Sequence, residues 1–128
     1  MPEMKDLTPN FRHVRLLLAR STAHPQGEPD EGYDLLLPLD ESGRLDTATW
    51  KTHQAFCRVR RFGEKGEARI GRLRRKPGGQ WYFDYEEGDV DDEIGFRLGE
   101  ESFVTGEYVS IKQDGTMRTY QVARVEKP

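Results

Sequence analysis

The stretch "RVRRFGEKGEARIGRLRRKPGGQWYFDYEEGDVDDE", from Arg58 to Glu93, begins with a run rich in arginine and ends with a run of aspartate and glutamate. Apolar and charged residues alternate on both sides of Pro77-Gly78-Gly79, which predicts a β-hairpin that turns at this tripeptide. A shift of the pairing by one residue would set Leu73 against an acid, so the alternation favours a single register. That register pairs Gly71 with Tyr85, Arg72 with Asp84, Leu73 with Phe83, Arg74 with Tyr82 and Arg75 with Trp81.

Two stretches before this hairpin also alternate with the period of a strand. In the stretch from Phe11 to Arg20, Val14, Leu16 and Leu18 fall on one face, and His13, Arg15 and Leu17 fall on the other. In "GYDLLLPLD", Tyr33, Leu35, Leu37 and Leu39 alternate with Asp34, Leu36 and Pro38. Proline cannot donate a hydrogen bond to a neighbouring strand, so Pro38 indicates a strand end or a sheet edge.

The last third of the chain repeats the hairpin pattern. Asp114-Gly115 predicts a tight turn, and pairing outward from it sets Val109 opposite Tyr120 and Tyr108 opposite Gln121. The segment that carries Phe96 and Leu98 predicts a further strand before this hairpin. Ile70 points to the exposed side of its strand in the register given above.

One short segment has the pattern of a helix. Asp46 is placed as the N-cap, and Leu45 before it and Trp50 after it are spaced as a hydrophobic staple. Because the later apolar residues are too irregular for a long stripe, we predict a short helix over about Thr47 to Phe56.

These elements predict a mainly β fold. About six to eight strands, one short α-helix and no helical crossovers are typical of a small antiparallel, partly open β-barrel, with two packed sheets as the alternative. The length suits a single domain over residues 1–128. Composition predicts a flexible N-terminal segment over residues 1–10 and a mobile loop over residues 21–32.

Composition also sets expectations for location. Apolar and charged residues each make up 34% of the chain, and the formal net charge is −3. The N-terminus lacks the pattern of a secretory signal, and no apolar run approaches the ~20 residues of a spanning helix. Cys57 is the single cysteine, so no intrachain disulfide can form. We therefore expect a cytoplasmic protein that does not associate with a membrane.

No residue pattern points to catalysis or to a cofactor. His13, His24 and His53 fall in different elements, and none is paired with another at ligand spacing. Cys57 lacks an identifiable orienting group and oxyanion site, so we expect a small core residue. The glycines from Gly63 to Gly71 match neither a Rossmann nor a P-loop motif. We predict no catalytic, cofactor-binding or metal site.

The acidic run offers a candidate surface. Asp89, Asp91 and Glu93 alternate like the first ligands of a calcium loop, but the position that needs glycine is Ile94. We therefore expect a solvated loop between strands that presents a surface to a partner or a cation, formed by Asp89, Asp91, Asp92 and Glu93.

The basic run offers a second candidate surface with two interpretations. Its arginines could follow a phosphate backbone while rings stack on bases, which predicts RNA or single-stranded DNA binding through Arg58, Arg60, Arg72, Arg74 and Lys76 with Tyr82. Alternatively, the acidic run from Asp84 onward neutralises the arginines across the hairpin, and Trp81, Phe83 and Tyr85 belong to the core. The separated charges could also join two copies of the chain.

The stretch "FVTGEYVSI", with the preceding "WYFDYEEGDVDDEIGFRLG", resembles a small family of bacterial proteins without an assigned activity. The resemblance implies a bacterial cytosolic protein and carries no residue roles. Our leading expectation is a non-enzymatic module that binds an unidentified protein partner or a second copy of itself. Nucleic-acid binding through the basic hairpin is the first alternative, and an enzymatic or small-ligand barrel with a pocket not yet located is the second.

Overall fold

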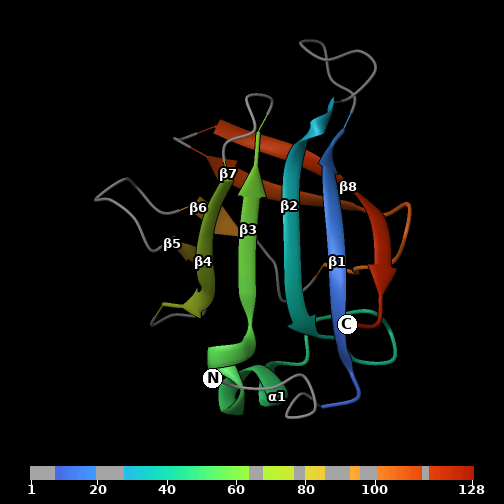
Figure 1. Cartoon of the computed structure of the whole chain (residues 1–128), viewed down its shortest axis with the longest axis vertical. Coiled ribbons are helices and arrows are strands. Elements are labelled where there is room, and N and C mark those ends of the chain that lie inside the picture. Colours follow the sequence, from blue (N-terminus) through green and yellow to red (C-terminus); the bar gives the residue numbers. More distant parts are fainter. Residues whose placement is uncertain are drawn as a thin grey trace.

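The computed structural model describes residues 8–19, 28–63, 68–76, 80–85, 93–95, 101–113 and 116–128 (Figure 1). Its elements in chain order are β1 (Phe11–Leu18), β2 (Glu28–Pro38), α1 (Thr47–Thr52), the 3-10 turn η2 (Gln54–Phe56), β3 (Arg58–Phe62), β4 (Ala68–Arg75), β5 (Trp81–Tyr85), β6 (Glu93–Gly95), β7 (Tyr108–Gln113) and β8 (Thr116–Glu126).

The strands form an antiparallel barrel. Each strand pairs with the next one along the chain, and β1 pairs with β8 to complete the ring. Among the described residues, β6 pairs with β7 through Ile94 opposite Lys112. The predicted small antiparallel barrel with one short helix is therefore confirmed, and continuous pairing replaces the alternative of two packed sheets.

The register predicted for the hairpin of β4 and β5 is also confirmed. Leu73 lies opposite Phe83, and these two side chains are buried, whereas Ile70 is 47% exposed. Pairing of β7 with β8 likewise sets Val109 opposite Tyr120. The turns at residues 77–79 and 114–115 lie outside the described residues. Because alternate residues of a strand face opposite sides, one buried apolar pair fixes the facing of every other residue in its hairpin.

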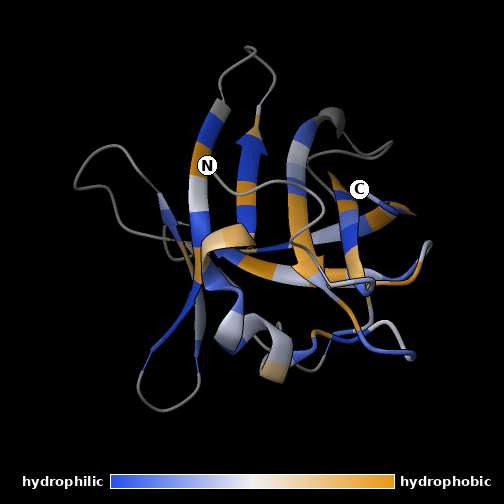
Figure 2. Ribbon diagram, turned by 60° about the horizontal axis from the view of Figure 1, so that its bottom comes forward, coloured by the Kyte–Doolittle hydropathy of each residue, from blue (hydrophilic) through white to orange (hydrophobic). Residues whose placement is uncertain are grey.

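Aromatic rings fill the inside of the barrel. The Tyr33 ring lies between those of Phe83 and Tyr120, with ring centroids 5.3 Å and 5.0 Å away, and all these side chains are buried. Hydrophobic and hydrophilic residues alternate along the strands in Figure 2, as expected for a wall with one buried face. Functional side chains must therefore be sought on the outer face or at the ends.

Helix α1 closes one end of the barrel (Figure 1). The Asp46 carboxylate caps it by accepting a hydrogen bond from the Thr49 backbone N–H at 3.1 Å, as the sequence predicts. The Trp50 indole Nε1 donates to the Leu73 carbonyl oxygen at 3.0 Å, and its ring packs edge-on against Trp81. The indole therefore fastens the helix to β4 and to the core.

The helix is shorter than predicted. It ends at Thr52, and a separate 3-10 turn occupies Gln54–Phe56. His53 leaves helical geometry, and its backbone N–H is shared between the carbonyl oxygens of Thr49 and Trp50. Because β3 must start at Arg58 to pair with β2, the chain turns sooner than the residue pattern indicates.

The structure corrects one predicted segment boundary. Strand β2 begins at Glu28, so residues 28–32 of the predicted loop over 21–32 are strand, which follows because β1 extends to Leu18 and pairs with Glu28 there. Of the predicted flexible segment over 1–10, residues 1–7 lie outside the described residues, and the Asn10 carbonyl oxygen accepts from the Leu39 N–H. Strand β6 is Glu93–Gly95, and the predicted strand residues Phe96 and Leu98 lie outside the described residues.

Candidate functional site

The arginines of the predicted basic surface lie on the outside of the barrel wall. Val59 and Leu73 point inward and are buried, so their neighbours along β3 and β4 point outward. Arg58 on β3 lies directly opposite Arg72 on β4. The strand alternation thus brings together the outward residues of the prediction: Arg58, Arg60, Arg72 and Arg74.

Strand pairing arranges the outward side chains in two rows across the wall. One row runs through Glu126, His13, Leu36, Arg58, Arg72 and Asp84. The next row runs through Arg124, Arg15, Asp34, Arg60 and Ile70. We call the side chains of these two rows the arginine face. The face combines residues from six strands that follow one another around the barrel, namely β8, β1, β2, β3, β4 and β5. Strand β8 lies far from the others along the chain.

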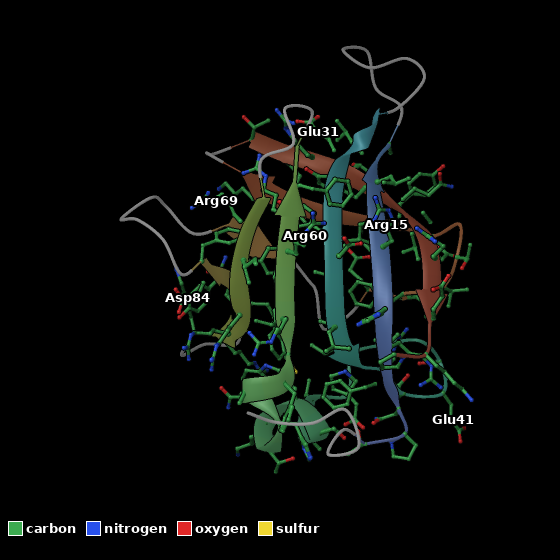
Figure 3. The ribbon with its side chains drawn as sticks, in the orientation of Figure 1. Arg15, Glu31, Glu41, Arg60, Arg69 and Asp84 are labelled. Carbon is green, nitrogen blue, oxygen red and sulfur yellow. The ribbon has the colours of Figure 1, made fainter. Side chains whose placement is uncertain are left out.

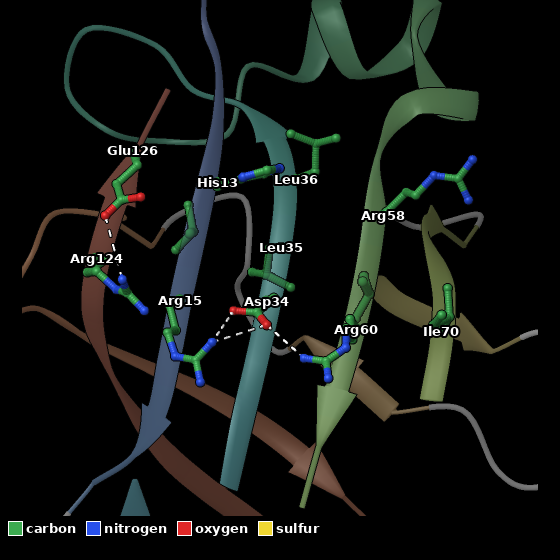
Figure 4. A pocket seen from close by; sticks show the side chains of 12 residues that line it. His13, Arg15, Asp34, Leu35, Leu36, Arg58, Arg60, Ile70, Arg124 and Glu126 are labelled. Carbon is green, nitrogen blue, oxygen red and sulfur yellow. Dashed lines mark hydrogen bonds and ion pairs between the residues drawn. The ribbon is translucent and has the colours of Figure 1, made fainter. Parts of the chain in front are cut away.

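Asp34 is the centre of an ion-pair network on the arginine face (Figure 4). Arg15 Nη1 donates to Asp34 Oδ1 at 3.1 Å, and Arg60 Nη1 donates to Asp34 Oδ2 at 3.0 Å. The Arg15 guanidinium also lies 4.5 Å from the centroid of the Phe62 ring. Figure 3 shows Arg15 and Arg60 on the same side of the wall, on β1 and β3. One carboxylate thus holds two guanidinium groups that approach it from opposite sides.

The sequence prediction missed Arg15 and Asp34 as parts of this surface. Their alternation placed each of them on the outward side of its own strand, but nothing in either stretch indicates that β2 lies between β1 and β3. Arg60 and Asp34 are 26 residues apart in sequence. The consecutive pairing of β1 with β2 and of β2 with β3 brings these side chains together.

Asp84 neutralises a different arginine from the one that lies opposite it. Its Oδ2 accepts from Arg74 Nε at 2.6 Å, although its cross-strand partner is Arg72. Neutralisation across the hairpin is therefore confirmed for Arg74. Within the described ranges, Arg58 and Arg72 form no ion pair, and both side chains are half-buried.

A groove of about 450 Å³ lies over the arginine face. Arg15, Arg58, Arg60 and Arg124 contribute to its lining together with the apolar side chains of Leu36 and Ile70. Figure 4 shows Arg58 extending from β3 toward β4, and His13 next to Leu36. The groove therefore presents cationic groups beside apolar surface.

The aromatic residues of β5 do not form a stacking platform. Trp81, Phe83 and Tyr85 are 4%, 0% and 6% exposed, which confirms that they belong to the core. Tyr82 points outward and is half-buried, with the Lys76 ammonium 5.2 Å from its ring centroid. Tyr82 is thus the one ring of β5 that a ligand on the outer face could reach.

The remaining candidate residues show no catalytic arrangement in the described part of the chain. Burial raises the pKa of Cys57 to about 12, and its thiol donates to the His53 carbonyl oxygen at 3.5 Å, so Cys57 is the core residue that the sequence predicts. The described residues contain no group of three or more metal-binding side chains. His24, Asp89, Asp91 and Asp92 lie outside the described residues, and of Glu93 the backbone in β6 is described.

A scan against models of known protein families, a search of curated proteins and a search of solved structures each found no match. The resemblance to bacterial proteins stays a prediction. Among the helices that the structure describes, none is long and apolar enough to cross a bilayer.

Proposed function

We propose that this chain is a non-enzymatic interaction module that binds an acidic segment of a partner protein across the arginine face. The observation that carries this proposal is the pair Arg58 and Arg72, which lie opposite each other on adjacent strands. Neither forms an ion pair with another described residue. Like charges placed directly opposite each other destabilise a sheet, and a bound anion would remove that repulsion.

The local charge supports an acidic partner. The two rows of the arginine face contain five arginines and three carboxylates, so this surface is basic although the chain has a formal net charge of −3. Complementary charge of this kind directs a partner to one face and fixes its orientation. The rest of the surface, being acidic on average, would repel the same partner.

Three features favour a protein segment over nucleic acid. The rings of Trp81, Phe83 and Tyr85 are buried, so bases would find few partners for stacking. Asp34 and Asp84 stand among the arginines, where they would repel successive phosphates of a nucleic-acid backbone. Apolar side chains also line the groove, and they suit the side chains of a peptide better than a sugar-phosphate chain.

The other functions expected from the sequence receive less support. The inside of the barrel is filled by the rings of Tyr33, Phe83 and Tyr120, and the groove described above lies on the outside of the wall. A small-ligand or enzymatic barrel would instead enclose a pocket with a titratable group inside it. A second copy of the chain is an alternative partner, which the oligomeric state tests.

The experiment measures fluorescence anisotropy of a short labelled peptide composed of aspartate, glutamate, leucine and serine, with the full chain as titrant. We expect saturable binding that weakens as salt rises, because exposed charges are screened. The double variant Arg58→Glu and Arg72→Glu should weaken binding by at least about tenfold. The matched control, Lys51→Glu with Lys112→Glu, makes the same charge change on exposed residues that line no part of the groove.

Four results would contradict the proposal. Equal loss of binding in the control variant would show that peptide binding depends on the overall charge of the chain. Labelled single-stranded RNA or DNA that binds where the peptide does not would assign the face to nucleic acid, and no binding of any probe at low salt would leave the face without this role. Light scattering could show that the wild-type chain is a dimer and that the Arg58 and Arg72 variant is not. The partner would then be a second copy of the chain.

A further inference from the structure

The network around Asp34 shows how this surface holds an oxyanion. The Asp34 carboxylate lies between guanidinium groups from β1 and β3, with Nη1 to oxygen distances of 3.1 Å to Arg15 and 3.0 Å to Arg60. The two arginines are therefore separated by one strand, and a single carboxylate forms an ion pair with each of them. The same wall thus provides a working example of cross-strand arginine clamping.

Arg58 and Arg72 have the elements of such a clamp but no oxyanion. They are directly opposed on adjacent antiparallel strands, where opposite Cα atoms lie about 4.5–5.5 Å apart. The next residue in the row, Asp84, is engaged by Arg74 at 2.6 Å. Of the arginines that point outward from β1 through β5 in the described ranges, these two are left without a carboxylate.

We propose that Arg58 and Arg72 form a phosphate-binding subsite, so that the acidic partner segment presents a phosphorylated side chain to them. This inference rests on the proposed function and names the chemistry that the same face selects. Two guanidinium groups carry two positive charges, and a phosphorylated side chain carries nearly two negative charges at neutral pH. A carboxylate would neutralise one of the two, and the planar fork of arginine matches phosphate oxygens well.

The surroundings favour one isolated phosphate group. Leu36 lies beside Arg58 in the same row, and Ile70 lies beside Arg60 in the next row, so the subsite borders apolar surface. Apolar neighbours lower the local dielectric and strengthen the attraction between guanidinium and phosphate. Asp84 at one end of the pair and Asp34 in the adjacent row would repel further phosphates. A single phosphorylated residue next to an aliphatic residue fits this pattern.

The experiment compares three labelled peptides that are identical except at one position, which holds phosphoserine, glutamate or serine. Wild-type chain should bind the phosphoserine peptide about tenfold more tightly than the glutamate peptide, because charge-assisted forked hydrogen bonds form with phosphate. Arg58→Gln with Arg72→Gln should bring these two affinities together. Arg58→Lys with Arg72→Lys should give a smaller preference, since it keeps the charge and loses the fork.

Two controls separate recognition from folding and charge. Lys51→Gln with Lys112→Gln makes the same charge change elsewhere on the exposed surface and should leave the phosphoserine preference unchanged. Urea unfolding of the Arg58→Gln and Arg72→Gln variant should show stability equal to or above that of wild type, because the opposed charges are gone. Titration with inorganic phosphate should shift the NMR signals of the Nε–Hε groups of Arg58 and Arg72.

The outcomes distinguish the two proposals. If the phosphoserine and glutamate peptides bind wild-type chain equally well, the phosphate subsite is wrong and the acidic interaction face stands. If none of the peptides binds, the proposed function fails and the subsite fails with it. If single-stranded RNA displaces the labelled phosphoserine peptide at a lower concentration than the unlabelled peptide does, Arg58 and Arg72 bind nucleic-acid phosphate. This inference is then overturned.

Discussion

Gly32 lies directly opposite Phe62, and the Phe62 ring lies over the space that a side chain at position 32 would occupy. A Cβ atom built on Gly32 would be 1.9 Å from the Leu16 carbonyl oxygen and 3.1 Å from Phe62 Cζ. The Arg15 guanidinium then stacks on this ring while it pairs with Asp34. The close approach of β1 to Gly32 therefore underlies the position of the ion-pair network above it.

Gly32→Ala should destabilise the fold strongly. The clash is with a backbone oxygen, which cannot move without shifting β1, so we expect a loss of about 3 kcal/mol in the free energy of unfolding. Urea unfolding followed by tryptophan fluorescence measures it. Gly63→Ala is the matched control, because a Cβ there would meet no atom within 4 Å. Equal stability of the two variants would show that β1 does not approach Gly32 this closely in solution.

Asp34→Asn should change stability and binding in opposite directions. The substitution removes the charge that neutralises Arg15 and Arg60, so we expect a loss of about 1 kcal/mol in the free energy of unfolding. The released guanidinium groups should bind an acidic peptide more tightly. Glu31→Gln serves as the control, because Glu31 is 3.9 Å from Arg118 in a looser pair and should matter less. Weaker peptide binding by the Asp34 variant would argue against an anion site on this face.

Asp46→Ala should remove the helix cap and about 1 kcal/mol of stability at neutral pH. Hydrogen bonds from the Thr49 side chain and backbone N–H lower the pKa of Asp46 in the folded chain. Stabilisation by the carboxylate is therefore complete above the pKa of the unfolded chain and is lost as pH falls through the lower folded pKa.

The stability difference between wild type and the Asp46 variant should consequently shrink below about pH 4. Urea unfolding at neutral pH and at about pH 3 measures this difference. Glu41→Ala changes an exposed acid in the preceding turn that has no hydrogen bond among the described residues, and it should show little effect at either pH. A difference that stays constant on acidification would mean that the cap does not depend on the ionised carboxylate.

The Cys57 thiol should be unreactive in the folded protein. Burial raises its pKa to about 12, so the thiolate that attacks a disulfide reagent is scarce at about pH 8. Labelling with Ellman's reagent should be slow in buffer and fast in urea, with a rate that follows unfolding. Fast stoichiometric labelling in buffer would place the thiol at the surface and reopen a chemical role for it.

Local pattern was sufficient for the backbone register within a hairpin. The register of β4 with β5 could be predicted because Leu73 and Phe83 are both buried and the strands are joined by a short connection. The cap at Asp46 was predictable for the same reason, since it involves the next turn of the chain. The end of the helix was not, because it depends on where β3 must begin.

The sequence by itself determined the class of the fold, the register of its hairpins and the outward direction of the arginines, because strand period and turn chemistry act between near neighbours. For Trp81, Phe83 and Tyr85 it left the core as one of two interpretations, and their burial in the structure decided between them. Only the tertiary structure decided which carboxylate meets which arginine. Arg15, Asp34 and Arg60 come from three strands that the sheet register sets side by side, and Asp84 pairs with Arg74 although Arg72 lies opposite it. Such pairings depend on side-chain geometry across the finished wall, which no local pattern records.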